Sequence, residues 1–182
     1  SLVGFDASSK PVADLASWQV ISPTQYRFKL GEAGRRFHDG SPLTVKDVQA
    51  TYESLLALKD SPLSAEFFNI SRIQSLDDNT LDFYLNAADS AFPAKLIIGV
   101  LPAAQIATGR DFSHHPLGSG PLAFERWTNT LQLKRVADSQ IITLLEVKDP
   151  TVRILKLMRG EVDMLQGDLP PELVRYLKDQ PN

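Results

Sequence analysis

The chain has 182 residues, of which 43% are hydrophobic and 23% charged, the proportions of a globular protein that can bury a core. Nineteen Lys and Arg residues stand against 22 Asp and Glu residues, so no basic excess is available to hold a nucleic-acid backbone. Cysteine is absent, which excludes disulfides and thiolate metal sites.

The longest apolar stretch, FPAKLIIGVLPAA at 92–104, is interrupted by Lys95 and is shorter than the ~20 residues of a membrane span. The sequence begins at Ser1 and ends at KDQPN, directly after a helix-like segment. We therefore expect the chain to be a piece of a longer protein.

The first half of the chain predicts two β-hairpins on either side of a helix. Apolar and polar residues alternate over 17–30, as in two short half-buried strands. Thr44 and Asp47 form a capping-box-like start to a helix with one apolar face, which the KDSP stretch at 59–62 ends. A second hairpin is expected over 70–85, with its turn at 77–79.

The middle of the chain predicts a short buried helix over 90–101, with Pro93 near its first turn. Residues 103–116 look polar and loop-like, and we place a domain boundary there. The second half then alternates strand and helix, which favours α/β organisation. Its expected strands are 121–127, 131–136, 141–147 and 161–166, the third of them buried on both faces, and its expected helices are 150–159 and 170–179, the first bounded by Asp149 and Gly160.

The adjacent His38 and Asp39 raise the question of catalytic or metal chemistry. Such a site needs further His, Asp or Glu side chains at the same spot, and the other histidines, His114 and His115, lie far along the chain. Neighbouring residues of an extended chain also point in opposite directions. We therefore interpret the stretch as a tight turn with Gly40, in which Asp39 tolerates unusual backbone angles.

The glycine-rich stretch Gly118-Ser119-Gly120 lacks the Gly-x-Ser-x-Gly pattern of a nucleophile elbow, so it and Ser113-His114-His115 argue only weakly for a hydrolase. It also lacks the spacing of a phosphate loop and predicts a backbone that bends or is closely approached. The acidic residues around Asp77 lack calcium-loop spacing and predict a solvated turn. Phe67 and Phe68 are core residues by default, with a ligand-facing wall as the alternative.

Five stretches, in this order, together resemble one family, the bacterial extracellular solute-binding proteins of family 5, which include oligopeptide, dipeptide and nickel binders. They are LVGFD at 2–6, PVADLASWQV at 11–20, FHDGSPLTVKDVQATY at 37–52, PLGSGPLAFERW at 116–127 and DPTVRILKLMRGEVDML at 149–165. Two departures are a short ADSQ loop at 137–140 and Leu122, where the family usually has tyrosine.

The resemblance implies a mixed α/β (α+β) fold, a partial type II periplasmic-binding-protein-like architecture. Residues 1–103 would form the small accessory domain and 104–182 part of the first binding lobe. In this family the His-Asp-Gly stretch is a structural turn. The ligand-contacting positions implied here are Phe67 or Phe68 and Gly118, Ser119 and Gly120, while the main ligand anchors would lie in a C-terminal half that the sequence does not include.

The implied function is capture of a small solute, usually a peptide, in the periplasm and its delivery to an ABC-type import permease. The resemblance implies a monomer with no catalytic residue, cofactor or metal site. Two alternatives stay open on the same scaffold: the solute-sensing domain of a transcriptional regulator, and a metal or metallophore binder that uses His38, His114 or His115.

Overall fold

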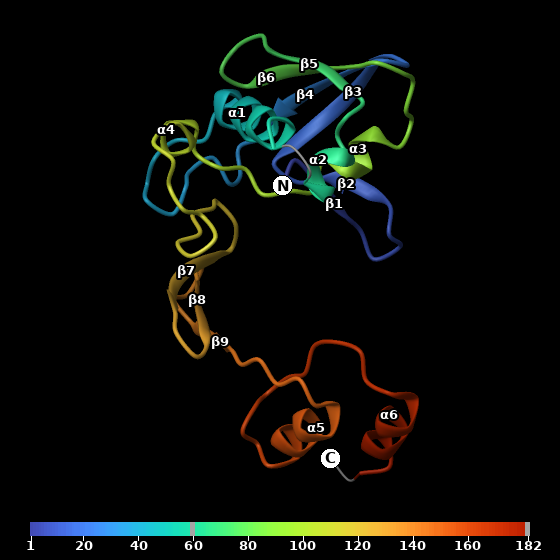
Figure 1. Ribbon diagram of the computed structural model, residues 1–182, viewed down its shortest axis with the longest axis vertical. Coiled ribbons are helices and arrows are strands. Elements are labelled where there is room, and N and C mark those ends of the chain that lie inside the picture. Colours follow the sequence, from blue (N-terminus) through green and yellow to red (C-terminus); the bar gives the residue numbers. More distant parts are fainter. Residues whose placement is uncertain (59–60, 181–182) are drawn as a thin grey trace. The chain divides into compact units, whose positions relative to one another are not determined.

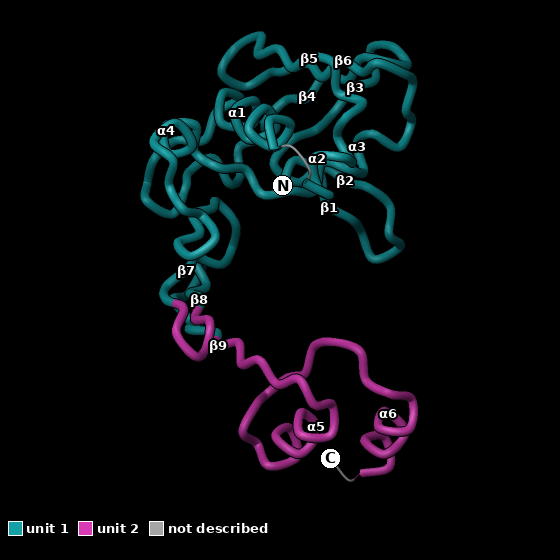
Figure 2. The backbone as a smooth tube through the Cα atoms, in the orientation of Figure 1, with its two compact units in different colours: residues 1–126, 133–142 teal, residues 127–132, 143–182 magenta. Residues whose placement is uncertain are grey.

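The computed structural model describes residues 1–58 and 61–180 and divides the chain into two compact units (Figures 1 and 2). Unit 1 comprises Ser1–Arg126 and Leu133–Ile142, and unit 2 comprises Trp127–Gln132 and Thr143–Asn182. The fold is mixed α/β, as the sequence predicts.

Unit 1 is built on a four-stranded antiparallel sheet in the order β3-β4-β6-β5. Its strands are β3 (Ala16–Ser22), β4 (Gln25–Leu30), β5 (Ile70–Ser75) and β6 (Thr80–Leu85). Strands β3 and β4 form the first predicted hairpin, and β5 and β6 form the second. Alternate residues of a strand point to the same face of a sheet. Tyr26, Phe28 and Leu30 of β4 are all buried, so their face is the covered one.

Helix α1 (Val45–Leu56) covers the apolar face of this sheet. The predicted capping box is present: Thr44 accepts from the N–H of Lys46 (3.3 Å), and Asp47 accepts from the N–H of Thr44 (2.8 Å). The ring of Tyr52 on α1 packs edge-on against Phe83 of β6, with the centroids 5.4 Å apart. The helix ends at Leu56, and Lys59 and Asp60 of the predicted stop lie outside the described residues.

Short elements complete unit 1: β1 (Val3–Phe5) pairs with β2 (Pro11–Ala13), and α2 (Pro62–Ala65) follows α1. The helix expected over 90–101 is only α3 (Phe92–Lys95). Beyond it the chain turns irregular, because Leu96 and Val100 both enter the core. The segment predicted as loop begins with a short helix, α4 (Ala103–Ala107), which continues from Pro102.

Strands β7 (Leu122–Trp127), β8 (Leu131–Arg135) and β9 (Ile141–Leu144) form a three-stranded sheet in that order, as predicted. The expectation that β9 is buried on both faces is wrong. Ile141 is 50% exposed and Leu144 is 47% exposed, and because the two side chains point to opposite faces, neither face of β9 is fully covered.

Unit 2 contains helices α5 (Pro150–Met158) and α6 (Pro171–Lys178), both predicted. Asp149 caps α5 by accepting from the N–H of Val152 (2.9 Å), and Gly160 has φ +67° after its end. The strand predicted over 161–166 is absent. A strand needs a partner, whereas the carbonyl of Gln166 accepts from the Arg153 guanidinium of α5 instead.

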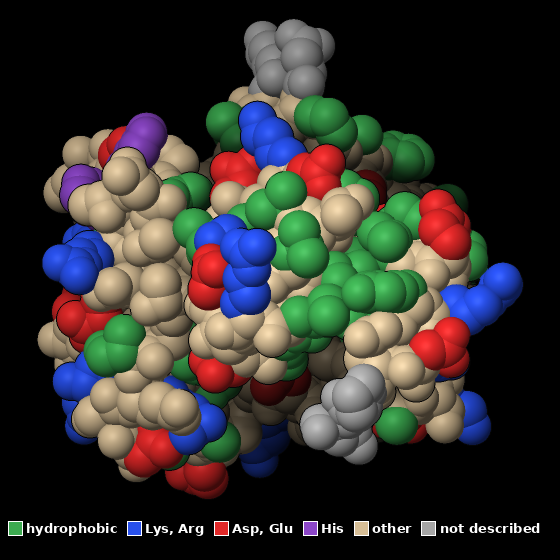
Figure 3. All heavy atoms as spheres, turned by 90° about the horizontal axis from the view of Figure 1, so that it is seen from below, with side chains coloured by type: hydrophobic (Ala, Val, Ile, Leu, Met, Phe, Trp, Pro, Cys, Tyr) green, Lys and Arg blue, Asp and Glu red, His purple; other side chains and the backbone are tan. Residues whose placement is uncertain are grey.

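Apolar side chains of both helices remain in contact with solvent. In Figure 3 hydrophobic side chains gather on the face seen from below. Val152, Leu155 and Met158 of α5 are each more than 40% exposed. Among residues 1–58 and 61–180, no helix is long and apolar enough to span a bilayer.

Candidate functional site

The His-Asp-Gly stretch forms a turn, as predicted. One carboxylate oxygen of Asp39 accepts from the N–H (2.9 Å) and the hydroxyl (2.6 Å) of Ser41. These hydrogen bonds hold the pKa of Asp39 below its ordinary value. The unusual backbone angle lies at Gly40, with φ +85°, and not at Asp39 as expected. Glycine is favoured there because it has no Cβ to clash.

His38 ties this turn to the glycine-rich stretch far along the chain. Its backbone N–H donates to the carbonyl of Gly118 (2.9 Å). Its ring nitrogen Nε2 lies 2.8 Å from the carbonyl oxygen of Gly120. Since a carbonyl only accepts, Nε2 carries the hydrogen. The histidine that suggested chemistry therefore holds two main-chain carbonyls.

Residues that follow His38 bind the same crossing segment, which we define as residues 101–120. The second carboxylate oxygen of Asp39 accepts from Gln105 Nε2 (2.9 Å). Asp47, which is 8% exposed, accepts from the N–H of Ala103 (2.8 Å). Thr51 accepts from the N–H of Leu101 (2.9 Å). The turn and helix α1 together fix the crossing segment, and we call His38, Asp39, Asp47 and Thr51 the latch.

A hollow of about 700 Å³ lies beside the latch, within unit 1. Glycine is favoured at position 34 in its wall, because Gly34 has φ +69° and an added Cβ would lie 2.6 Å from Cδ2 of Leu15, which would have to shift. The hollow is mostly apolar. Its lining residues are Ser1, Asp14, Leu15, Ala33, Gly34, Gly99, Val100, Leu101, Leu117, Gly118, Ser119, Gly120, Pro121, Val136 and Ala137.

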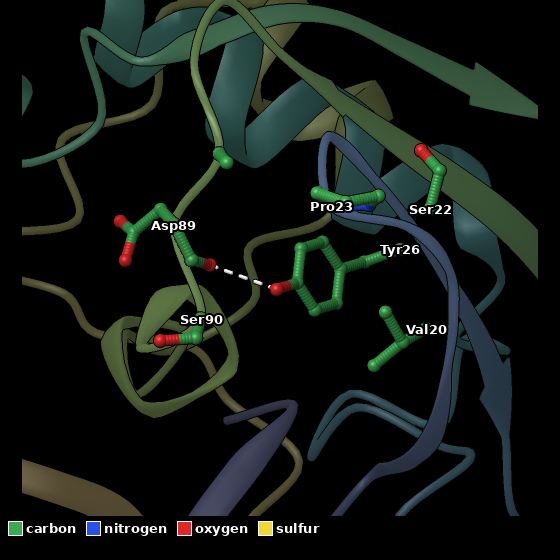
Figure 4. A pocket seen from close by; sticks show the side chains of 7 residues that line it. Val20, Ser22, Pro23, Tyr26, Asp89 and Ser90 are labelled. Atoms are coloured by element: carbon green, nitrogen blue, oxygen red, sulfur yellow. Dashed lines mark hydrogen bonds between the residues drawn. The ribbon is translucent and has the colours of Figure 1, made fainter.

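A second hollow of about 510 Å³ lies at the end of strand β3 (Figure 4). The hydroxyl of Tyr26 points across it and donates to the carbonyl of Asp89 (2.8 Å), and burial raises the pKa of this phenol. The carboxylate of Asp89 is paired with Lys95 (2.6 Å) and accepts from the N–H of Ala91 (3.0 Å). The main polar groups of this second hollow are thus bonded within the protein. We therefore take the first hollow, at Gly118, as the candidate site.

The structure brings Gly118, Ser119 and Gly120 into this hollow but separates the two phenylalanines from each other. Phe67 is 1% exposed and packs edge-on against Tyr52, with the centroids 5.3 Å apart. Phe68 is 77% exposed. Of the pair, only Phe68 has a free face to offer a ligand.

Several lining residues escape sequence reasoning, among them Asp14, Leu15, Gly34 and Val136. They come from separate parts of the chain, so no local spacing joins them. The one available signal was the turn-rich GEAG stretch at 31–34, where a glycine with positive φ is common.

The Ser-His-His stretch forms no nucleophile–base pair. The hydroxyl of Ser113 donates to the carboxylate of Asp111, and His114 Nδ1 lies 2.6 Å from that carboxylate. Both hydrogen bonds hold the pKa of Asp111 well below its ordinary value. The serine is thus bonded to the acid rather than to an imidazole base, which is not the arrangement that activates a nucleophile.

The three histidines have different partners: Gly120 for His38, Asp111 for His114 and the ring of Phe124 for His115. Within the described ranges, no three His, Asp or Glu side chains are grouped as metal ligands.

The profile of the bacterial extracellular solute-binding proteins, family 5 Middle, matches residues 10–182. The chain therefore belongs to this family, which consists of binding proteins and not of enzymes. The family resemblance and the type II periplasmic-binding-protein-like fold expected from the sequence, present here in part, are both confirmed.

Curated relatives include the HTH-type transcriptional regulator SgrR of Shigella dysenteriae, 37% identical over 134 residues, which are 71% of this chain and 22% of the regulator. SgrR of an Escherichia coli O6:H1 strain is 39% identical over 127 residues, 67% of this chain and 21% of the regulator. The chain thus spans about a fifth of the length of these relatives.

Solved structures with the same fold include the binding protein AgaA of A. tumefaciens R10 in complex with agropinic acid. It is 27% identical with a TM-score of 0.80, and the match covers 88% of this chain and 36% of AgaA. A periplasmic oligopeptide-binding protein of Thermotoga maritima with bound mannohexaose is 26% identical with a TM-score of 0.77. The match covers 98% of this chain and 37% of the Thermotoga protein. NikZ of Campylobacter jejuni with Ni(L-His) is 23% identical with a TM-score of 0.86, and the match covers 100% of this chain and 39% of NikZ. At this identity the likeness shows the shared fold alone.

Proposed function

We propose that the chain forms part of a periplasmic binding protein that captures a peptide and delivers it to an ABC-type import permease. The observation that carries the proposal is the hollow lined by Gly118, Ser119 and Gly120, held by His38. Membership of a solute-binding family supports a ligand role for it. In this proposal residues 1–103 are the accessory domain, residues 104–182 belong to the first lobe, and the protein acts as a monomer.

The physical basis is burial of the solute between two lobes, so that affinity depends on both. The match with the 182-residue chain covers 36% of AgaA and 37% of the Thermotoga maritima protein, so we expect the chain to lack much of the contact surface. A charge-assisted anchor on the other lobe would contribute about 1.5–3 kcal/mol. The chain alone should therefore show no measurable peptide affinity by calorimetry, and micromolar binding would contradict this arrangement.

The test of the proposal is a thermal-shift screen of the whole protein against peptides, metal chelates and sugars. A ligand that binds only the native state at ~100 times its Kd adds about 2.7 kcal/mol of stability. A raised melting temperature with peptides alone would support peptide capture. A shift with sugars or chelates alone would reject the peptide and keep solute capture.

A second candidate is a solute-sensing domain of a transcriptional regulator. The identity of 37–39% to SgrR regulators favours it, since the solved binding proteins above reach only 27%. The sequence upstream of Ser1 in the gene decides between the two. A signal peptide would support export and transport, whereas a basic helix-turn-helix would support regulation.

A further inference from the structure

We propose that Gly118, Ser119 and Gly120 form a donor rim that receives a carboxylate or carbonyl oxygen of the solute, with His38 as its positioning residue. The proposal rests on the solute-capture function and deepens it, since it names the ligand group and the atoms that meet it. Three observations carry it: the carbonyls of the rim, its N–H groups and the chemistry of the hollow around it.

Two of the three main-chain carbonyls of the rim, those of Gly118 and Gly120, are already engaged. The carbonyl of Gly118 accepts from the backbone N–H of His38 (2.9 Å), and that of Gly120 accepts from His38 Nε2 (2.8 Å). The next carbonyl, of Pro121, accepts from the N–H of Val136 (2.9 Å). A ligand therefore meets few free acceptors along this stretch.

The donors of the rim, in contrast, are unused. Among residues 1–58 and 61–180, no atom accepts from the N–H of Gly118, Ser119 or Gly120 or from the Ser119 hydroxyl. Gly120 keeps the backbone accessible, since no atom lies within 4 Å of the position that a Cβ there would take, whereas a Cβ on Gly118 would lie 3.8 Å from the His38 ring. The stretch can thus offer a ligand up to four hydrogen-bond donors.

The hollow around the rim defines the ligand group further. Its walls include the apolar side chains of Leu15, Val100, Leu117 and Val136, and hydrogen bonds are stronger beside apolar walls than in water. The carboxylate of Asp14, which also lines the hollow, already accepts from the Ser1 hydroxyl (2.8 Å). A singly charged carboxylate or a neutral amide carbonyl suits the row of donors better than phosphate does, because phosphate brings more negative charge next to Asp14.

His38 acts on the ligand only through the rim. Its Nε2 hydrogen is given to Gly120, so it is a positioning residue rather than a ligand contact. Glutamine can place an amide N–H near the same spot, whereas asparagine is one methylene shorter and falls short of Gly120. This pair of variants changes the reach of the side chain while keeping it polar.

The experiment is a two-dimensional ¹H–¹⁵N NMR titration of the protein with acetate, acetamide and methylammonium. We expect acetate and acetamide to move the amide signals of Gly118, Ser119 and Gly120 downfield and saturably, and methylammonium to leave them in place. His38→Asn should weaken the apparent affinity for acetate about tenfold, and His38→Gln should restore it. His114→Gln, at a histidine that is bonded elsewhere, is the control.

Each outcome decides one claim. Amide signals that stay in place with both acetate and acetamide overturn the donor rim, whatever the solute screen gives. A solute that raises the melting temperature without moving these signals leaves solute capture intact and overturns the rim. Movement with acetate while no solute stabilises the protein supports the rim and counts against the proposed function. Equal acetate affinity in His38→Asn and His38→Gln, at unchanged melting temperatures, overturns the positioning role.

Discussion

The two compact units use similar local signals but differ in how their apolar residues are buried. In unit 1 the rings of Phe28, Tyr52, Phe83 and Phe92 are buried and pack on one another. In unit 2, among the described residues, Ile154 is the one fully buried hydrophobic residue, at 2% exposure. Capping alone therefore defines a helix without providing a core, and the stability of the chain resides in unit 1.

The largest expected effect comes from the centre of the unit 1 core. Phe83→Ala should destabilise the fold by about 3–5 kcal/mol, because it removes a fully buried ring and leaves a cavity. The measurement is urea unfolding followed by the fluorescence of Trp18, which stacks on Phe28 in unit 1, in a Trp127→Phe background.

Ile154→Ala in unit 2 is the matched comparison for Phe83→Ala, and it should leave the Trp18 transition almost unchanged. An equal loss from both variants would show that the two units unfold as one, and would remove the distinction between them.

Two glycines with nearly the same backbone angle test the difference in packing between the two units. Gly34 in unit 1 has φ +69°, and Gly160 in unit 2 has φ +67°. Gly34→Ala should cost about 2–3 kcal/mol, because the strained backbone adds to a collision with Leu15. Gly160→Ala meets no atom within 4 Å and should cost about 1–2 kcal/mol, from the backbone alone. Thermal unfolding of both variants, with the loss taken from the transition of the unit that holds each glycine, checks this, and equal losses would mean that Leu15 moves aside freely.

The loss of stability at low pH tests the contact between Arg27 and Asp82 in the unit 1 sheet. Asp82 is buried, and its oxygens accept from Arg27 Nε and Nη2, both at 2.8 Å. The Arg27 hydrogen bonds hold the pKa of Asp82 below its ordinary value. Its contribution is thus complete above the unfolded pKa of about 4 and is lost as the pH falls through the lower folded pKa.

Asp82→Asn should accordingly cost about 1.5 kcal/mol at pH 7 and progressively less below pH ~4. Urea midpoints between pH 2 and pH 7, compared with the original chain, give the two curves. A constant gap between them across this range would rule out the charge of Asp82 as the cause.

The smallest expected effect compares the two helix caps. Thr44→Ala at α1 and Asp149→Ala at α5 should each cost their own helix about 1 kcal/mol. Only the first should lower the Trp18 transition, since α1 packs on the unit 1 core whereas Asp149 lies in unit 2. A response of Trp18 to the Asp149 variant would contradict the separation of the units.

The sequence predicts what is decided locally. Alternation over 17–30 and 70–85 correctly predicts both hairpins, and the Thr44 and Asp149 caps correctly predict α1 and α5. The prediction fails where the structure of a segment depends on a partner far away in the sequence. Val162 and Met164 alternate like a strand, yet no strand among residues 1–58 and 61–180 pairs with them, and Met164 is 79% exposed.

The candidate site shows the same division between local and distant causes. The turn at Asp39 and Gly40 follows from residue types alone. That the ring of His38 reaches Gly120 does not, because the two are 82 residues apart. The hollow was therefore beyond prediction, although the Gly-Ser-Gly stretch that lines it was expected to matter.

The latch also affects the order in which the protein folds. Its hydrogen bonds join residues 50 apart at Thr51 and Leu101, 56 at Asp47 and Ala103, and 66 at Asp39 and Gln105. Closing such loops costs entropy before any contact compensates for it, whereas hairpins close short loops within about 1–10 μs. We expect the hairpins to form early and the wall of the hollow to be assembled late. In a chain still emerging from the ribosome, the hairpins would form long before the hollow was complete enough to bind a solute.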